Sequence, residues 1–242
     1  MDNIRYSDLD LKMALLRVFG SGQKAKHKAN VLGGRGGRGE LERQLDTDFA
    51  DEERALAHRS MESLERDGLI QPTYKDVINP LDWLTLTETG KRALEREAVD
   101  DLDFLLISLD RGLLKSRHGA WSAVYSENPD TVRQAAHSAR ELLRLVLKRL
   151  APDDEVRRTK SFEDKTEIRR RDRVTFIMKS RVGRVSKSTR RVIEAQCNLV
   201  EKLYDRLSAV AHDPDPSALR DQVKRLIRAV EDALLEVLGS AA

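Results

Sequence analysis

Three long stretches in the second half of the chain repeat apolar residues at steps of three and four, the period of an amphipathic helix. They predict helices over residues 128–150, 188–211 and 216–237. Their apolar seams are Val132, Ala136, Ala139, Leu143, Val146 and Leu150; Val192, Gln196, Leu199, Leu203, Leu207 and Val210; and Leu219, Val223, Leu226, Val230, Leu234 and Val237. Such seams favour a helical bundle over residues 98–242. The polar Gln196 is also typical of a homodimer interface, where a buried amide fixes the register of paired helices.

The first hundred residues follow a different order of elements. The expected elements are helices near residues 7–20, 39–46 and 51–68, a short alternating strand at 83–87 and a helix from residue 90 to about residue 109. Ser7 and Asp10 form a capping box at the start of the first helix. Helices followed by an apolar pair, a turn-rich segment, a strand and a closing helix predict a winged helix-turn-helix over residues 1–97.

Two short segments also resemble a known family. RSMESLERDGLI (59–70) and WLTLTETGKRAL (83–94) are similar to the recognition helix, wing and closing helix of bacterial winged-helix regulators. The resemblance covers about residues 7–97. It implies that the helix ending in L-x-x-x-G-L-I enters a DNA major groove and that the L-T-x-x-G turn closes the wing.

The helix at 51–68 has an inward and an outward face. Steps of four and three place Ala57, Met61 and Leu64 on one side. The polar residues expected to contact nucleic acid are Arg59, Ser63 and Arg66 on the other side, with His58 on the flank. Arginine donors on a helix in the major groove reach phosphates and base edges. The alternative is a solvated face on a unit that binds protein or holds a dimer together.

Residues 22–39 are rich in glycine and basic residues and contain no acid. Their composition predicts a flexible loop with mobile cations at Lys24, Lys26, Lys28, Arg35 and Arg38. GGRGGRG (33–39) resembles the Arg-Gly segments of RNA- and DNA-binding proteins, which contact phosphates or enter a minor groove. The alternative is a plain linker.

Basic residues are unevenly spread. The net charge of the chain is only +3, yet basic side chains far outnumber acidic ones over residues 157–191. Such a segment indicates attraction to a polyanion, or an acidic surface elsewhere that neutralises it. Arg133, His137, Arg140 and Arg144 add a stripe opposite the apolar seam of their helix, at steps of four, three and four. We expect Arg133, His137 and Arg140 to bind nucleic acid.

A second candidate site lies at the end of the helix over 188–211. Arg206 and His212 bound the segment RLSAVAH, just before Pro214. At 100° per residue the two side chains diverge by about 120° on a continuous helix, so they converge only if the helix loosens or a second protomer contributes. The alternative is a histidine capping helix carbonyls beside a surface arginine.

This pair resembles the Arg-x(4–6)-His motif of the HEPN superfamily, whose all-helical domains include metal-independent endoribonucleases. In that family two copies of the motif meet across a dimer interface. The resemblance implies that His212 is the acid–base acting on a ribose 2′-hydroxyl and that Arg206 stabilises charge on the phosphate. The sequence departs from the commoner motif at Leu207, where a polar residue usually follows the arginine.

Residues 119–155 carry another resemblance. Asn128-Pro129-Asp130, followed by Ala136-His137-Ser138 and Arg140-Glu141-Leu142, is similar to a helical domain of predicted nucleases associated with prokaryotic Piwi-like defence systems. The resemblance implies a defence context and a partner protein from the same system.

The sequence lacks the motifs of several common functional sites. The single cysteine, Cys197, excludes an internal disulfide and a thiolate metal site, and the five histidines lack metal-ligand spacing, so we expect neither metal nor cofactor. No phosphate-binding glycine loop or dinucleotide fingerprint occurs. The absence of a membrane-length apolar run or a leader segment predicts a cytoplasmic protein.

These observations predict a mainly α protein, a winged helix-turn-helix followed by a HEPN-like helical bundle. A composition of 35% charged and 5% aromatic residues suits solvated helices. The expected function is binding of duplex DNA or RNA, with metal-independent RNA cleavage as the sharper hypothesis. The alternative is a non-catalytic DNA-binding regulator or adaptor whose helical domain dimerises or docks a partner.

Overall fold

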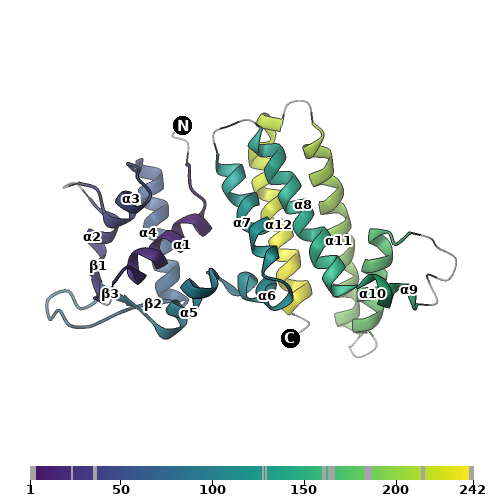
Figure 1. The fold of residues 1–242 in the computed structure, drawn as a ribbon, viewed down its shortest axis with the longest axis horizontal. Coiled ribbons are helices and arrows are strands. Elements are labelled where there is room, and N and C mark those ends of the chain that lie inside the picture. The colour runs from purple at the N-terminus through teal and green to yellow at the C-terminus, as the bar shows by residue number, and fades with distance from the viewer. Residues whose placement is uncertain are drawn as a thin grey trace. The chain divides into compact units, whose positions relative to one another are not determined.

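The protein is described by a computed structural model that covers residues 4–22, 24–34, 37–126, 128, 130–159, 162, 167–182, 187–213 and 216–239. The chain divides into two compact units, Met1–Asp100 and Asp101–Ala242. Helices dominate the described residues, and one small sheet lies in the first unit (Figure 1). The predicted mainly α class is confirmed.

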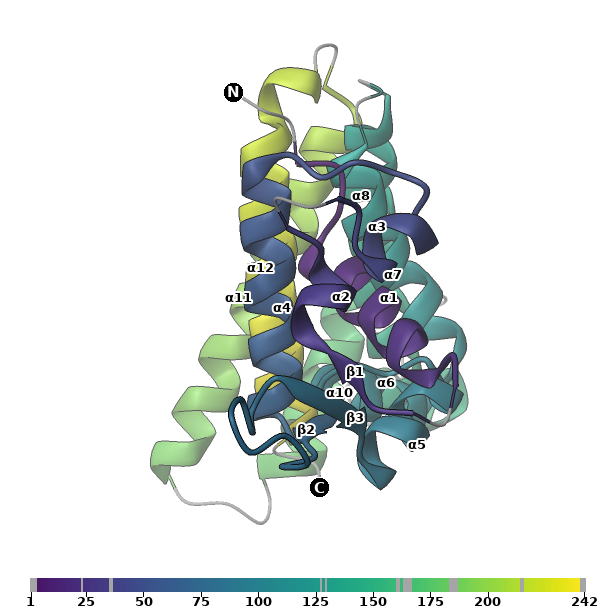
Figure 2. The same cartoon turned by 90° about the vertical axis from the view of Figure 1, so that its left-hand side faces the viewer.

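The N-terminal unit combines helices with a three-stranded antiparallel sheet. Its elements are α1 (Asp8–Gly20), β1 (Lys26–His27), α2 (Lys28–Leu32), α3 (Glu40–Gln44), α4 (Asp51–Arg66), β2 (Ile70–Pro72), β3 (Trp83–Leu86) and α5 (Glu88–Arg96). The strand order is β1-β3-β2, with Lys26 opposite Leu84 and Ile70 opposite Leu86. Helix α4 packs on α1 and α2 (Figure 2).

Local sequence signals explain why the first helices form. The predicted capping box is present: the amide of Asp10 donates to Ser7 Oγ at 3.1 Å, and the amide of Ser7 donates to Asp10 Oδ2 at 3.1 Å. The predicted inward face of α4 is also confirmed, because Ala57, Met61 and Leu64 are buried. Burying a methionine or leucine side chain contributes roughly 1.5–3 kcal/mol, so Met61 and Leu64 hold α4 against its neighbours.

The L-T-x-x-G turn has a steric cause. Thr87 Oγ1 accepts a hydrogen bond from the amide of Gly90 at 2.9 Å and donates to the carbonyl of Gly68 at 2.7 Å. A β-carbon on residue 90 would lie 1.9 Å from the carbonyl oxygen of Leu69. The turn therefore needs a glycine, because the start of α5 lies directly against the residues that lead into β2.

Residues 22–39 differ from the expected loop. They contain strand β1 and helix α2, and Val31 and Leu32 are buried in the unit. Two apolar side chains and pairing with β3 outweigh the glycine-rich composition that favoured a loop. The helix expected from Gly90 onward is also shorter than predicted, since Glu97 adopts a left-handed conformation (φ 59°) that ends α5.

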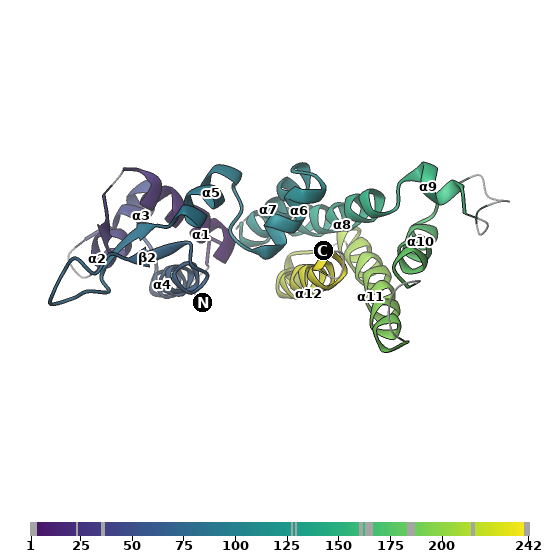
Figure 3. The same ribbon diagram turned by 90° about the horizontal axis from the view of Figure 1, so that it is seen from below.

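The second unit is helical throughout its described residues. Its elements are α6 (Asp101–Leu109), α7 (Gly112–Tyr125), α8 (Thr131–Leu150), α9 (Asp153–Arg157), α10 (Arg170–Val182), α11 (Lys187–Ala211), the 3₁₀ helix η2 (Pro216–Leu219) and α12 (Arg220–Gly239). Helix α8 packs on α7, α10, α11 and α12, and forms the middle of the bundle (Figure 3). Helix α8 begins at Thr131, within the predicted range of 128–150, and Pro129 lies outside the described residues.

The predicted seams form the core of this unit. The seam residues of α8 from Val132 to Val146 are buried, as are those of α12 from Val223 to Val237. In α11, Leu203 and Leu207 are buried but Leu199 is 39% exposed, and the side chain of Gln196 lies outside the described part. Because the seams cover one another within a single chain, they do not by themselves require a dimer.

None of the described helices has the length and apolarity needed to cross a membrane.

Candidate functional site

Helix α4 presents the predicted nucleic-acid-binding residues on its outer face. His58, Arg59 and Arg66 are exposed, and Ser63 is half-buried. Arg66 Nε lies 4.0 Å from a carboxyl oxygen of Asp67, whose other carboxyl oxygen accepts from Ser63 at 3.0 Å. The helix also carries the acids Asp51, Glu52, Glu53, Glu62 and Glu65. Acidic residues outnumber basic ones over residues 1–100, so Arg59 and Arg66 belong to a unit with a net negative charge.

Most cations of the glycine-rich segment are held by carboxylates, contrary to the expectation that they are mobile. Lys26 pairs with Glu40, and Lys28 Nζ lies 3.1 Å from Glu65 Oε2. Arg38 Nη2 donates to Asp48 Oδ2 at 2.8 Å, and this interaction lowers the pKa of Asp48. Lys24 is exposed, and Arg35 lies outside the described residues. Among the described cations of this segment, only Lys24 is consistent with the prediction of a mobile cation.

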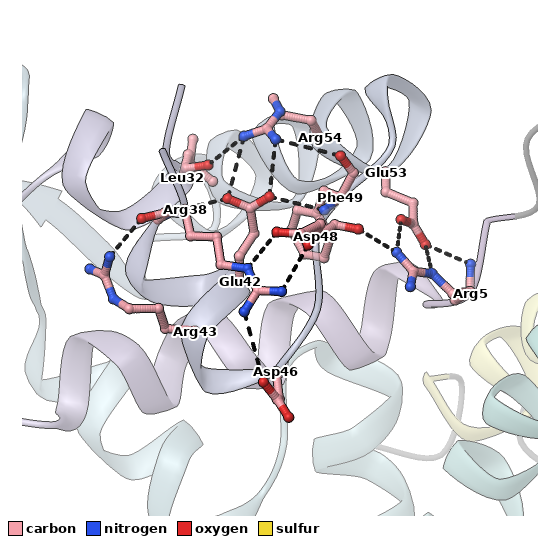
Figure 4. A network of polar contacts seen from close by, with 11 residues as sticks. Arg5, Leu32, Arg38, Glu42, Arg43, Asp46, Asp48, Phe49, Glu53 and Arg54 are labelled. Carbon is pink, nitrogen blue, oxygen red and sulfur yellow. Dashed lines mark hydrogen bonds and ion pairs between the residues drawn. The ribbon is translucent and has the colours of Figure 1, made fainter. Parts of the chain in front are cut away.

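Two buried glutamates hold α3 and α4 in place (Figure 4). Glu42 accepts from the amides of Gly39 and Phe49 at 2.9 Å each and from Arg54 Nη2 at 3.0 Å. Burial raises the pKa of Glu42, but these hydrogen bonds and the Arg54 charge outweigh burial and hold the pKa below its usual value. The glutamate therefore joins the start of α3, the segment after it and α4 into one rigid part.

Glu53 plays the same role at the start of α4. It accepts from the amide of Ala50 at 3.1 Å and from the backbone amide and guanidinium of Arg5 at 2.6–3.0 Å. Burial again raises the pKa of Glu53, and the Arg5 and Ala50 hydrogen bonds outweigh it, so the pKa is lowered. The network fixes the helix that carries Arg59 and Arg66 and adds no chemistry of its own.

The structure does not join the two predicted catalytic side chains. Arg206 and His212 are both exposed, and no hydrogen bond connects them among the described residues. His212 follows the last residue of α11, and its amide donates to the carbonyl of Ala209 at 3.2 Å. The helix therefore tightens here and does not loosen, so the first of the two conditions for convergence is not met within α11. A tighter turn advances by about 120° per residue, which reduces the angle between the two positions.

The stripe on α8 does come close to His212. Arg133 donates to the carbonyl oxygen of Asp213 from Nη2 at 2.8 Å and from Nε at 3.3 Å. Further along, Arg140 Nη2 donates to His137 Nδ1 at 3.0 Å, and the Arg140 guanidinium lies 5.9 Å from the centre of the Tyr204 ring on α11. The structure thus brings His137 and Arg140 together and places Arg133 beside the residue after His212.

A cavity that the sequence analysis did not find lies where α8, α10 and α11 meet. Its volume is about 350 Å³. The lining residues are Arg144, Leu147, Lys148, Glu167, Ile168, Arg169, Arg170, Arg173 and Tyr204. We call this the cationic cavity. The basic segment indicated the charge of the cavity. Its walls come from three helices and from the residues just before α10, and no local pattern reveals how these pack together.

A buried ion-pair cluster is the second feature missed from the sequence. Asp103 on α6 is fully buried and accepts from Arg117 Nη1 at 2.5 Å, while Arg117 Nε donates to Glu231 on α12 at 2.7 Å. Trp121 Nε1 donates to the same Glu231 oxygen at 2.7 Å. His118 lies 3.3 Å from both oxygens of Asp103. The cluster ties α6, α7 and α12 together.

In the described part of the chain, no group of three histidine, cysteine or carboxylate side chains is placed to hold a metal.

Comparison with known proteins places the helical unit in a family. The family described as predicted pPIWI-associating nuclease matches residues 106–237, more than half of the chain. The chain belongs to this family. In this predicted pPIWI-associating nuclease the match includes the α8 stripe, the cationic cavity, Arg206 and His212, whereas the N-terminal unit lies outside it. The resemblance seen in residues 119–155 is confirmed. No curated protein and no solved structure matches the chain.

Proposed function

We propose that this protein is a nucleic-acid-binding nuclease of a Piwi-associated defence system and that it cleaves RNA on its helical unit without a metal ion. The observation that carries the proposal is the hydrogen bond from Arg133 to the carbonyl of Asp213. Asp213 directly follows His212 in the chain, so the bond holds Arg133, at one end of the basic stripe, next to the residue after His212. A strand bound by the stripe would therefore have its backbone near the residue proposed as acid–base.

The stripe is suited to a phosphate backbone. Arg133, His137, Arg140 and Arg144 follow one another along one side of α8. Eleven helical steps of 1.5 Å make it about 16 Å long. Arginine forks bind phosphate oxygens in pairs, and each neutralised phosphate releases counterions into solution. Binding to this surface should therefore weaken steeply as salt rises.

His212 supports a defined reaction. Histidine takes up or releases a proton near neutral pH. His212 would remove the proton from a ribose 2′-hydroxyl as its oxygen bonds to the adjacent phosphorus, and the bond from phosphorus to the 5′-oxygen would break. A proton returned to that oxygen leaves a 5′-hydroxyl and a 2′,3′-cyclic phosphate. Arg206, from the same chain or from a second protomer, would stabilise the charge on the phosphate.

Incubation of labelled RNA and DNA with the protein in EDTA tests this proposal. We expect RNA products that end in cyclic phosphate, and no cleavage by His212→Ala, whose fold and RNA affinity should be retained. Arg225→Ala is the control, since it removes an exposed basic side chain from α12 that belongs neither to the stripe nor to the proposed catalytic pair. Equal cleavage by the parent and His212→Ala would move the active site to the Arg133, His137 and Arg140 stripe.

For the N-terminal unit we propose a winged helix-turn-helix that contacts duplex DNA. The strand order β1-β3-β2, with α4 preceding β2, supports this assignment. Helix α4 would be the recognition helix, and residues 73–82 between β2 and β3 would form the wing. Arg59 and Arg66 would contact DNA from the exposed face of α4.

A second candidate function is that of a non-catalytic adaptor. It is favoured by the acidic balance of residues 1–100 and by the exposed apolar side chains of Val77 and Ile78 between β2 and β3. Such a surface suits a protein partner better than a phosphate backbone. If the parent protein cleaves no RNA under any condition, including with proteins of the same defence system present, the adaptor function replaces the nuclease.

A further inference from the structure

The cationic cavity contains an arginine with an unused donor. Arg170 begins α10, and its guanidinium lies 4.0 Å from the centre of the Tyr204 ring. Its Nη2 donates to Asp205 Oδ1 at 2.7 Å. Its Nε atom is buried and has no hydrogen-bond partner among the described residues. Buried polar groups are almost always hydrogen-bonded, so an unpaired N–H in a cavity wall indicates an absent acceptor.

The surroundings favour an anion as that acceptor. Five basic side chains line the cavity, and Glu167 is the only acid among the described residues of its wall. One of the five, Arg144, also donates to Glu141 on the same helix at 2.7 Å. The Arg173 side chain is fixed in the cavity wall by the carbonyl of Ala151 and by Asp153, which neutralises part of its charge. The first residues of α10 also line the cavity, and the N-terminus of a helix attracts negative charge.

The size and position of the cavity narrow the choice of anion. A volume of about 350 Å³ is at the lower end of small-molecule sites and leaves room for roughly one nucleotide. Tyr204 also lies near Arg140, so the α8 stripe leads to the cavity along the side of α11. A nucleic-acid strand bound along the α8 stripe would therefore place one of its phosphates at the cavity.

We propose that the cationic cavity is a phosphate-binding subsite that takes one phosphate group of a nucleic-acid strand. Arg170 Nε is the donor at its centre, and Arg144, Lys148 and Arg169 surround the same phosphate. Tyr204 stacks on the Arg170 guanidinium and fixes the direction of the Nε–H bond. This proposal rests on the proposed function in one respect, namely that the phosphate belongs to a bound nucleic-acid strand.

Titration of ¹⁵N-labelled full-length protein with inorganic phosphate tests the subsite directly. We expect one arginine Nε–Hε signal to shift and to be absent from the spectrum of Arg170→Gln. Chloride at equal ionic strength is the control and should leave that signal in place. If phosphate moves no arginine signal of the cavity, the subsite does not exist, whatever the protein does to RNA.

Binding of RNA gives the second readout. Arg170→Gln should weaken binding about tenfold, because one charged hydrogen-bonded contact is lost, and should reduce the salt slope by about one ion. Lys148→Gln, on an exposed residue, repeats the test without disturbing Tyr204. Arg228→Gln is the matched control, an exposed arginine 5.9 Å from the Trp121 ring that does not line the cavity.

Two strands that differ only at the 5′ end distinguish the sources of the phosphate. A terminal phosphate in the cavity predicts that a 5′-phosphorylated strand binds more tightly than a 5′-hydroxyl strand and that Arg170→Gln removes the difference. An internal phosphate predicts equal binding of the two strands and an equal loss for both. Unchanged RNA affinity in Arg170→Gln and Lys148→Gln would overturn the subsite. Failure of the parent to bind or cut RNA would instead overturn the proposed function, and the phosphate titration would still decide the subsite.

Discussion

At the scale of single residues, the N-terminal unit depends on carboxylates that stay ionised in its interior. Glu42 and Glu53 are each about 1% exposed, and each accepts backbone amides together with an arginine. Breaking a fully buried ion pair costs roughly 3–5 kcal/mol. The lower end applies here, because the arginine partners are 29% and 39% exposed. These two side chains are therefore more sensitive to substitution than the exposed acids of α4.

The pKa of Glu42 predicts how stability depends on pH. Its pKa in the folded protein is below the ordinary value of 4.5, so its contribution is fully present above that value and is lost as the pH falls through the folded pKa. We expect Glu42→Gln to cost about 3 kcal/mol at pH 7 and to flatten the loss of stability in acid. Urea unfolding between pH 7 and pH 3 measures both, with Trp83 as the fluorophore in a Trp121→Phe background. An unchanged pH dependence would show that other groups control it.

Gly90 gives a steric prediction with an internal control. Gly90→Ala should destabilise the N-terminal unit by about 1–3 kcal/mol or more, because the new β-carbon would overlap the Leu69 carbonyl. A β-carbon at Gly34 meets nothing within 4 Å, so Gly34→Ala should leave stability nearly unchanged. Thermal unfolding of the two variants beside the parent is the measurement. Equal melting temperatures would mean that β2 and α5 separate at little cost.

At the scale of elements, the outer face of α4 carries the prediction of duplex binding. Arg59→Ala and Arg66→Ala should each weaken binding of the preferred duplex, by about 1–3 kcal/mol if the side chain reads a base. Lys24→Ala should weaken all duplexes alike, because phosphate contacts carry no sequence information. Arg17→Ala on α1 is the control, and fluorescence anisotropy at several salt concentrations is the measurement. Parent-like binding by both helix variants would remove α4 as the recognition helix.

The elements also show what the sequence could predict. The helices over 128–150, 188–211 and 216–237 follow from apolar periodicity, which is a local property of the chain. Strand β1 and helix α2 could not be found this way, since their pairing with β3 and the burial of Val31 and Leu32 depend on distant residues.

The candidate site follows the same rule: its local patterns could be predicted from the sequence, and its contacts between distant residues could not. The α8 stripe is a local pattern, and the structure retains it. The Asp103, Arg117 and Glu231 cluster joins residues 14 and 114 positions apart, and the cationic cavity needs three helices, so neither leaves a local signal.

At the scale of the whole molecule, the prediction is a homodimer at micromolar concentration. Leu199 remains 39% exposed on α11, in the same seam as Gln196, and a second protomer would cover it. Leu199→Glu should give a monomer in sedimentation experiments, and Lys202→Glu, at an exposed position of the same helix, should not. A parent protein that sediments as a monomer would exclude an active site shared between two protomers.

The connection between β2 and β3 has a consequence for handling the protein. Tyr74, Val77, Ile78 and Leu81 expose their apolar side chains there, Val77 by 96%. Side chains of this kind promote weak, reversible clustering as concentration rises, and ammonium sulfate would strengthen it. Light scattering alone would then overestimate the mass of the particle. A variant with both Val77→Ser and Ile78→Ser distinguishes this non-specific self-association from a specific dimer. It should improve solubility without altering a dimer formed through α11.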